Sequence, residues 1–132
     1  MTHSVVTATF IATEGDYLEA VIEVDGQRLH VMDEFGGAQL AAGTPFQAEL
    51  WPMVSELDDW DAIFRANPGR EKRLVRLDGW RYLALGEVIS VDPVICDCGL
   101  LLVADAFYTR DARCVGAYVG VTLARLDACR SG

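Results

Sequence analysis

Histidine and lysine are scarce in this chain, and the motifs of common catalytic sites are missing. The two histidines are His3 and His30, and Lys72 is the only lysine in 132 residues. There is no Gly-x-Ser-x-Gly motif and no evident histidine partner for a cysteine, so nucleophilic catalysis has little to build on. Gly36-Gly37 is not followed by the lysine of a Walker-type phosphate loop. We expect a protein that is not an enzyme and that carries no cofactor.

Long apolar runs and a secretion signal are also missing. No stretch approaches the ~18 apolar residues that a membrane-spanning helix needs, and the N-terminus has no basic leader. The four cysteines are therefore expected to be free thiols in a reducing compartment. Arginine outnumbers lysine ten to one, and alanine and glycine are abundant, which indicates a GC-rich bacterial genome. These features predict a bacterial, cytoplasmic protein that does not bind a membrane.

Acidic residues are concentrated in the first half of the chain. Residues 1–61 hold twelve Asp or Glu against one basic residue, Arg28, which gives 1 − 12 = −11. Residues 62–132 hold ten Arg or Lys against eight acids, which gives 10 − 8 = +2, and the halves sum to −9. Such asymmetry steers encounters with charged partners but does not select a fold.

Alternating apolar and polar residues predict two strands at the start of the chain, over 5–13 and 17–24. Their expected inward residues are Val6, Ala8, Phe10 and Ala12 in the first strand and Leu18, Ala20, Ile22 and Val24 in the second. Gly15-Asp16 is expected to turn the chain between them. Asp25-Gly26 then predicts a tight hairpin, because both central residues of a type I′ turn need positive φ.

The remaining sequence predicts further strands and one helix. Strands are expected over 44–54, 72–77, 80–91, 94–103 and 116–126, with Asp78-Gly79 as a second hairpin turn. Between 56 and 66 the apolar spacing is helical, and Ser55 with Asp58 is typical of a capping box. The segment 94–103 is apolar on both faces, which indicates a central strand.

These elements predict a mainly β fold in one domain, 1–132. About seven or eight hairpin-joined strands with one short helix favour a small antiparallel barrel. Three segments resemble, in their rhythm, the strands of OB-fold barrels: Gly86-Glu87-Val88, Asp97-Cys98-Gly99-Leu100 and Gly116-Ala117-Tyr118-Val119-Gly120-Val121. The resemblance implies a barrel that binds oligonucleotides, oligosaccharides or proteins on one face.

Cys96 and Cys98 flank an acidic residue, Asp97, in this apolar segment. Their spacing does not fit structural zinc, which usually takes Cys-x₂₋₄-Cys pairs and four ligands. On a strand the two thiols point to one apolar face, so we interpret them as small buried hydrophobes and expect no metal. Asp97 needs an ion-pair or hydrogen-bond partner there. A general acid or base in an uncharacterised enzyme is the alternative interpretation of this carboxylate.

Acidic residues around the predicted helix form the first candidate site. It consists of Trp51, Glu56, Asp58, Asp59 and Asp61. Carboxylates on such a surface attract a basic protein, and an exposed tryptophan is a typical interface anchor. The alternative is a solvated polar helix face with Trp60 in the core.

The second candidate site is basic and aromatic. Arg73, Arg76, Trp80 and Tyr82 have the combination of charge and stacking that single-stranded nucleic acid uses. However, a chain at −9 repels a polyanion, so we do not expect nucleic acid as the partner. The arginines are expected instead to pair with the acidic half, either within the chain or across a homodimer interface.

The leading functional hypothesis is a non-enzymatic domain that binds a basic protein through the acidic half. A bacterial antitoxin or immunity-type inhibitor fits this size and charge. The alternative is an OB-like barrel that binds a small ligand or single-stranded nucleic acid through the second site.

Overall fold

The computed structural model describes residues 4–14, 18–55 and 58–131. Its elements, in chain order, are β1 (Ser4–Glu14), β2 (Glu19–Val24), β3 (Gln27–Glu34), the 3₁₀ turn η1 (Gly37–Gln39), β4 (Pro45–Val54), α1 (Trp60–Arg65), β5 (Arg73–Arg76), β6 (Tyr82–Ser90), β7 (Ile95–Asp97), β8 (Leu102–Ala104), η2 (Ala112–Cys114) and β9 (Tyr118–Arg130). The fold is mainly β, as the sequence predicted. None of the described helices is long and apolar enough to cross a membrane.

Five strands close into a barrel in the order β1-β2-β3-β9-β4 and back to β1. β2 pairs with β1 and β3, and β4 pairs with β1 and β9, all antiparallel. β3 and β9 complete the barrel through a parallel pairing of 32–34 with 127–129. The predicted small barrel is therefore confirmed, although it is mixed rather than purely antiparallel. Closure removes the exposed sheet edges that an open sheet of the same strands would have.

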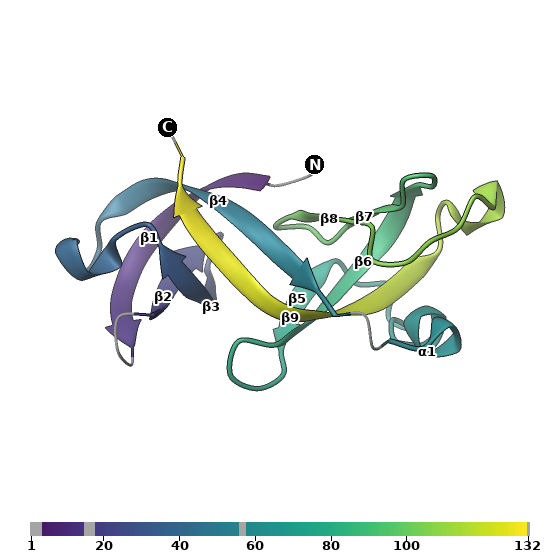
Figure 1. The fold of residues 1–132 in the computed structure, drawn as a ribbon, viewed down its shortest axis with the longest axis horizontal. Helices are drawn as coiled ribbons and strands as arrows, with labels where there is room; N and C mark the ends of the chain where they lie inside the picture. Colours follow the sequence, from purple (N-terminus) through teal and green to yellow (C-terminus); the bar gives the residue numbers. More distant parts are fainter. Residues whose placement is uncertain (1–3, 15–17, 56–57, 132) are drawn as a thin grey trace.

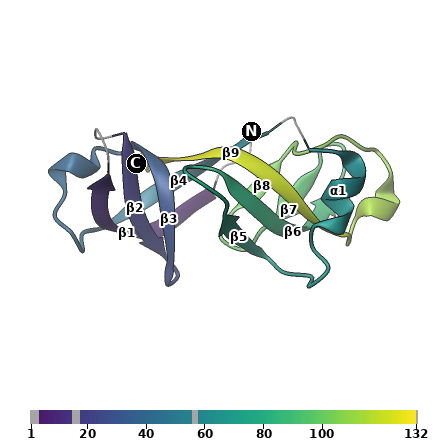
Figure 2. The ribbon, with the colours of Figure 1, turned by 90° about the horizontal axis from the view of Figure 1, so that it is seen from below.

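A second group of elements, β5 to β8 with α1, lies between β4 and β9 in the sequence. Figure 1 shows the barrel strands at one end, α1 at the other, and β9 running through both. β9 pairs with β6 over 118–123 and with β4 over 123–130, so one strand of 13 residues belongs to both groups. The view in Figure 2 shows the same division. Most of the segment whose rhythm resembled an OB fold thus lies outside the barrel.

Both hairpins predicted at Asp-Gly pairs are present, with different turns, whereas the turn predicted at Gly15-Asp16 lies outside the described residues. Asp25 and Gly26 have φ of 51° and 79°, as a type I′ turn requires, and connect β2 to β3. The β5–β6 hairpin turns one residue later than the Asp78-Gly79 pair suggested. The Asp78 carbonyl accepts the Arg81 amide at 2.8 Å, which makes Gly79 and Trp80 the central residues.

Two residues expected to face inward are exposed. The pairing of β1 with β2 shifts register between Phe10 and Ala12, and this bulge reverses the alternation, so that Ala12 faces outward. Leu18 precedes the first residue of β2 and is 56% exposed. The inward positions of Phe10, Ala20 and Ile22 are confirmed by their burial.

The segment 94–103 is two short strands rather than one central strand. β7 and β8 pair antiparallel around a tight turn at Gly99, whose φ is 85°. The Asp97 carboxylate accepts the Gly99 amide at 3.0 Å and stabilises this turn. Aspartate two residues before glycine is an ordinary turn signal. The apolar residues around it nevertheless led to the prediction of one continuous strand over 94–103.

The β5–β6 hairpin packs against the edge of β3 where β3 and β9 separate. The buried Tyr82 hydroxyl accepts the His30 amide at 2.6 Å and donates to the His30 carbonyl at 2.9 Å. The Gln27 side-chain amide donates to the Leu74 carbonyl at 2.8 Å, which satisfies the outer edge of β5. Polar side chains thus occupy the backbone groups that a neighbouring strand would otherwise pair.

Candidate functional site

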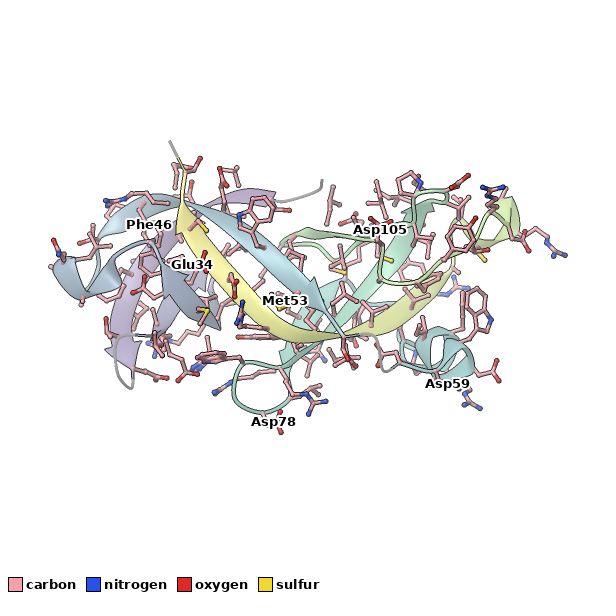
Figure 3. All side chains as sticks on the ribbon, viewed as in Figure 1. Glu34, Phe46, Met53, Asp59, Asp78 and Asp105 are labelled. Atoms are coloured by element: carbon pink, nitrogen blue, oxygen red, sulfur yellow. The ribbon has the colours of Figure 1, made fainter. Side chains whose placement is uncertain are left out.

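The predicted acidic patch is divided between two places. Trp51 lies on β4 opposite Asp127 of β9, in a pocket of about 320 Å³ that also contacts Glu34, Pro52, Met53 and Cys129. Asp58, Asp59 and Asp61 lie instead around the start of α1, and Glu56 falls outside the described residues. Figure 3 labels Glu34 on the barrel and Asp59 beside α1, well apart. Trp51 therefore does not share a pocket with the helix acids.

The pocket beside Trp51 contains a thiol that is not poised for reaction. The Cys129 thiol donates to the Glu34 carboxylate at 3.2 Å. Burial, followed by this hydrogen bond, raises the pKa of Cys129 to about 11. Arg125 holds the neighbouring Asp127 carboxylate at 2.6 Å. Because a thiolate is the nucleophilic form of cysteine, this pocket does not favour covalent chemistry.

Asp58 is fixed by β9 rather than by the helix. One of its carboxylate oxygens accepts the Thr122 amide at 2.6 Å, and the other accepts the Thr122 hydroxyl at 2.8 Å. The predicted capping box is wrong, because α1 begins at Trp60, after both of its proposed members. The acid in the first turn is Asp61 and the base in the last turn is Arg65, as the helix dipole prefers. Asp58 is consequently an anchored anion on the surface of β9.

Three aromatic rings meet beside Asp58. The Trp60 ring centroid lies 4.9 Å from that of Phe64 and 5.5 Å from that of Phe107. Trp60 nevertheless remains 46% exposed, so the interpretation that places it in the core is wrong. A pocket of about 290 Å³, which we call the α1 pocket, is lined by Ser55, Asp58, Trp60, Ile63, Ala106 and Phe107.

Sequence reasoning missed two residues of this region, Phe107 and Thr122. Phe107 belongs to the segment 105–111 that follows β8, and its neighbour Tyr108 is 69% exposed. The two adjacent aromatic residues Phe107 and Tyr108 were the available signal in the sequence. No local pattern marked Thr122, because its contact with Asp58 spans 64 residues of sequence.

The four residues of the basic and aromatic site do not share one face. Tyr82 is only 1% exposed, and its hydroxyl is bonded to His30, so it is not available to a ligand. Arg73 and Arg76 are three residues apart on a strand, which places them on opposite faces. Arg73 pairs with Glu71 at 3.0 Å, whereas Arg76 lies 3.2 Å from the His30 ring.

Trp80 stands apart from these arginines, at the hairpin turn. It is half-buried and lines a shallow pocket of about 490 Å³ with Glu19, Asp78, Gly79, Arg81 and Ala124. Its indole nitrogen is buried without a hydrogen-bond partner among the described residues. Arg81 is bound to Asp78 at 3.1 Å, so acids offset the base in this pocket. This arrangement does not favour a polyanion.

The β5–β6 hairpin lies against the β2–β3 hairpin beside His30. Val21 of β2 is buried although it pairs with the outward residue His30 of β3. The His30 side chain lies between Arg76 and Glu14, with its Nδ1 atom 3.4 Å from the Glu14 carboxylate.

Asp97 has the partners that its sequence context required. Lys72 lies 3.0 Å from Asp97 and 3.3 Å from Glu87, which faces Asp97 across β6 and β7. The Gly99 amide, followed by Lys72, lowers the pKa of Asp97. Hydrogen bonds to Asp97 and then Glu87 raise the pKa of Lys72. Asp97 therefore stabilises the Gly99 turn and pairs with Lys72, and its role as a general acid or base stays a prediction.

Cys96 and Cys98 are fully buried, as interpreted from the sequence. Burial raises the pKa of the Cys96 thiol to about 11 and that of the Cys98 thiol to about 12. Within the described ranges, no three His, Cys, Asp or Glu side chains are grouped as metal ligands would be.

The comparisons with known proteins identify no relative. A scan against models of protein families, a search of curated proteins and a search of solved structures each found no match to this chain.

Proposed function

We propose that this chain is a protein-binding domain that engages a basic partner through the surface formed by Asp59, Trp60, Asp61 and Phe107, here called the α1 surface. The observation that carries the proposal is the half-exposed Trp60, which packs against the partly buried rings of Phe64 and Phe107 while two exposed carboxylates flank it in sequence. Tryptophan in such a setting is the residue type most enriched among interface hot spots.

The distribution of ion pairs supports a basic partner. The Lys and Arg ion pairs in which both partners are described and given a distance each join two residues within 71–127. Pairing of these bases with the acidic half within the chain is thus not seen among these ion pairs, and pairing across a homodimer interface stays a prediction. The charge of −11 on residues 1–61 is not offset by these pairs. A field of this sign accelerates the approach of a cationic protein.

The test removes charge from the α1 surface without disturbing its support. In the double variant Asp59→Asn/Asp61→Asn, the anchored Asp58 is kept. Glu23→Gln/Asp25→Asn removes the same two charges from the distant β2–β3 hairpin, and asparagine tolerates the positive φ of Asp25. Tagged wild type and both variants are used to capture partners from nuclease-treated lysate of the source cells, and the captured protein is then titrated at low and high salt.

We expect the α1 variant to bind the captured partner at least ~10-fold more weakly at low salt, while the control pair stays close to wild type. Equal binding by the two variants would show that only net charge matters and would refute the assignment of the binding site to the α1 surface. Capture of nuclease-sensitive nucleic acid, rather than a protein, would favour the alternative of an oligonucleotide-binding barrel.

Size and charge support a narrower form of the proposal, an antitoxin or immunity-type inhibitor that occludes a cationic active site. This form predicts that the captured partner is itself an enzyme and that the chain inhibits it at one-to-one stoichiometry. An activity assay of the partner with and without the chain is the measurement.

A further inference from the structure

We infer that the α1 pocket binds the guanidinium group of an arginine side chain supplied by the basic partner. The inference rests on the proposed function and adds the chemical group that is recognised. It follows from the aromatic surface of the pocket, from the anchored carboxylate at its edge and from the charges of its lining residues.

The aromatic side of the pocket suits a flat cation. Trp60 and Phe107 line it with their rings at 89° to each other, and Phe64 packs against both rings at centroid distances of 4.9 and 5.5 Å. This support fixes the Trp60 ring while leaving it half-exposed. A guanidinium plane stacks on such a ring through cation–π attraction, and tryptophan is the best aromatic acceptor for it.

The carboxylate side of the pocket suits a forked donor. Asp58 uses one acceptor position on each oxygen for Thr122, at 2.6 and 2.8 Å. A carboxylate offers about four acceptor positions, so each oxygen retains one for an incoming N–H group. The paired donors of arginine match two such oxygens in parallel. Because Thr122 already holds the carboxylate in place, binding costs little further side-chain ordering.

The charges around the pocket select a cation over a neutral or anionic group. None of the six described residues that line it is basic, and Asp59 and Asp61 lie next to Trp60 in the sequence. Lysine is the competing cation, but its ammonium group is a compact, strongly hydrated point charge that does not stack through a plane. Arginine is the side chain that uses both sides of the pocket at once.

The experiment titrates the intact, isotope-labelled chain with N-acetyl-arginine N-methylamide and records amide and indole resonances. The neutral isostere N-acetyl-citrulline N-methylamide and the corresponding lysine derivative are the comparison probes. We expect saturable shifts at the Trp60 indole and the Thr122 amide, with a dissociation constant of about 1 mM. The Trp51 and Trp80 indoles serve as internal controls and should not move. Lysine should bind several-fold more weakly, and citrulline should cause no saturable shift.

Two variants test the two sides of the pocket. Asp58→Asn keeps an oxygen for the Thr122 amide but removes the charge, and we expect about tenfold weaker arginine binding. Phe107→Leu keeps an apolar wall but removes an aromatic ring, and a smaller weakening is expected. Glu23→Gln/Asp25→Asn should retain arginine binding within about threefold, since neither residue lines the pocket.

The outcomes separate this inference from the proposed function. Equal shifts with arginine and citrulline, no shift at Trp60 up to ~50 mM probe, or unchanged affinity in Asp58→Asn would each overturn the arginine pocket. If the captured partner still depends on Asp59 and Asp61 in that case, the proposed function stands without the pocket. Conversely, a functioning arginine pocket with a partner indifferent to the α1 surface would refute the proposed function alone.

Discussion

Removing the Tyr82 hydroxyl tests how the second group of elements is joined to the barrel. The hydroxyl bridges the amide and carbonyl of His30, at 2.6 and 2.9 Å, on the stretch of β3 that β9 does not reach. Tyr82→Phe keeps the buried ring and its packing, so it removes one oxygen without creating a large cavity. The substitution leaves two backbone groups without a protein partner.

The expected loss follows from those two groups. A neutral hydrogen bond contributes about 1 kcal/mol to folding, and an orphaned buried group costs about 1–3 kcal/mol. His30 is partly accessible, so water compensates in part, and we expect the free energy of unfolding to fall by about 2 kcal/mol. For a chain of this size, such a loss lowers Tm by about 6–10 °C.

Equilibrium urea unfolding and thermal melts, both followed by circular dichroism, measure this change. Tyr118→Phe is the matched control, because Tyr118 is also partly buried. Its described contact is with Arg70, 5.8 Å from the ring centroid, and involves the ring rather than the hydroxyl. We also expect the His30 amide to exchange faster with solvent in Tyr82→Phe. A loss below about 0.5 kcal/mol, or one equal to that of the control, would refute the bridging role of this hydroxyl.

Two further predictions concern packing and pH. Gly120→Ala should lower the free energy of unfolding by about 1–3 kcal/mol in urea denaturation, because the new Cβ would lie 2.6 Å from the Cβ of Ala66. Adding Ala66→Gly should recover part of this loss, whereas unchanged stability in Gly120→Ala would contradict the packing of α1 on β9. Because the pKa of Asp97 is lowered in the folded state, the ionised carboxylate contributes stability that is fully present above pH ~4 and is lost as pH falls through the folded-state pKa. The difference in unfolding free energy between wild type and Asp97→Asn should therefore shrink with acidification, and a difference that persists at pH 2 would show that the charge is not its cause. Because the pKa of Lys72 is raised, the stability that protonated Lys72 contributes to the same cluster is lost only as pH rises above 10.5.

The candidate site could be anticipated only in part from the sequence. The acids around 56–61 and the helical spacing were visible, because both are local patterns. The packing of Phe107 against Trp60 and the anchoring of Asp58 by Thr122 were not, since they join residues 47 and 64 positions apart. The assignment of Trp51 to the same patch failed for the same reason, because β4 carries it toward Asp127 and the barrel.

What the sequence determined by itself was the β character of the chain, the Asp25-Gly26 turn, the alternating burial around Ile22 and the need of Asp97 for a partner. These features depend on backbone sterics, on a two-residue period and on the cost of burying charge, all of which act within a few residues. The tertiary structure alone decided that β3 and β9 pair in parallel, that β9 serves both groups of strands, and that Tyr82 is buried. Those outcomes depend on which distant strands become neighbours, and a residue's exposed face is fixed only when the neighbouring strand or helix is in place.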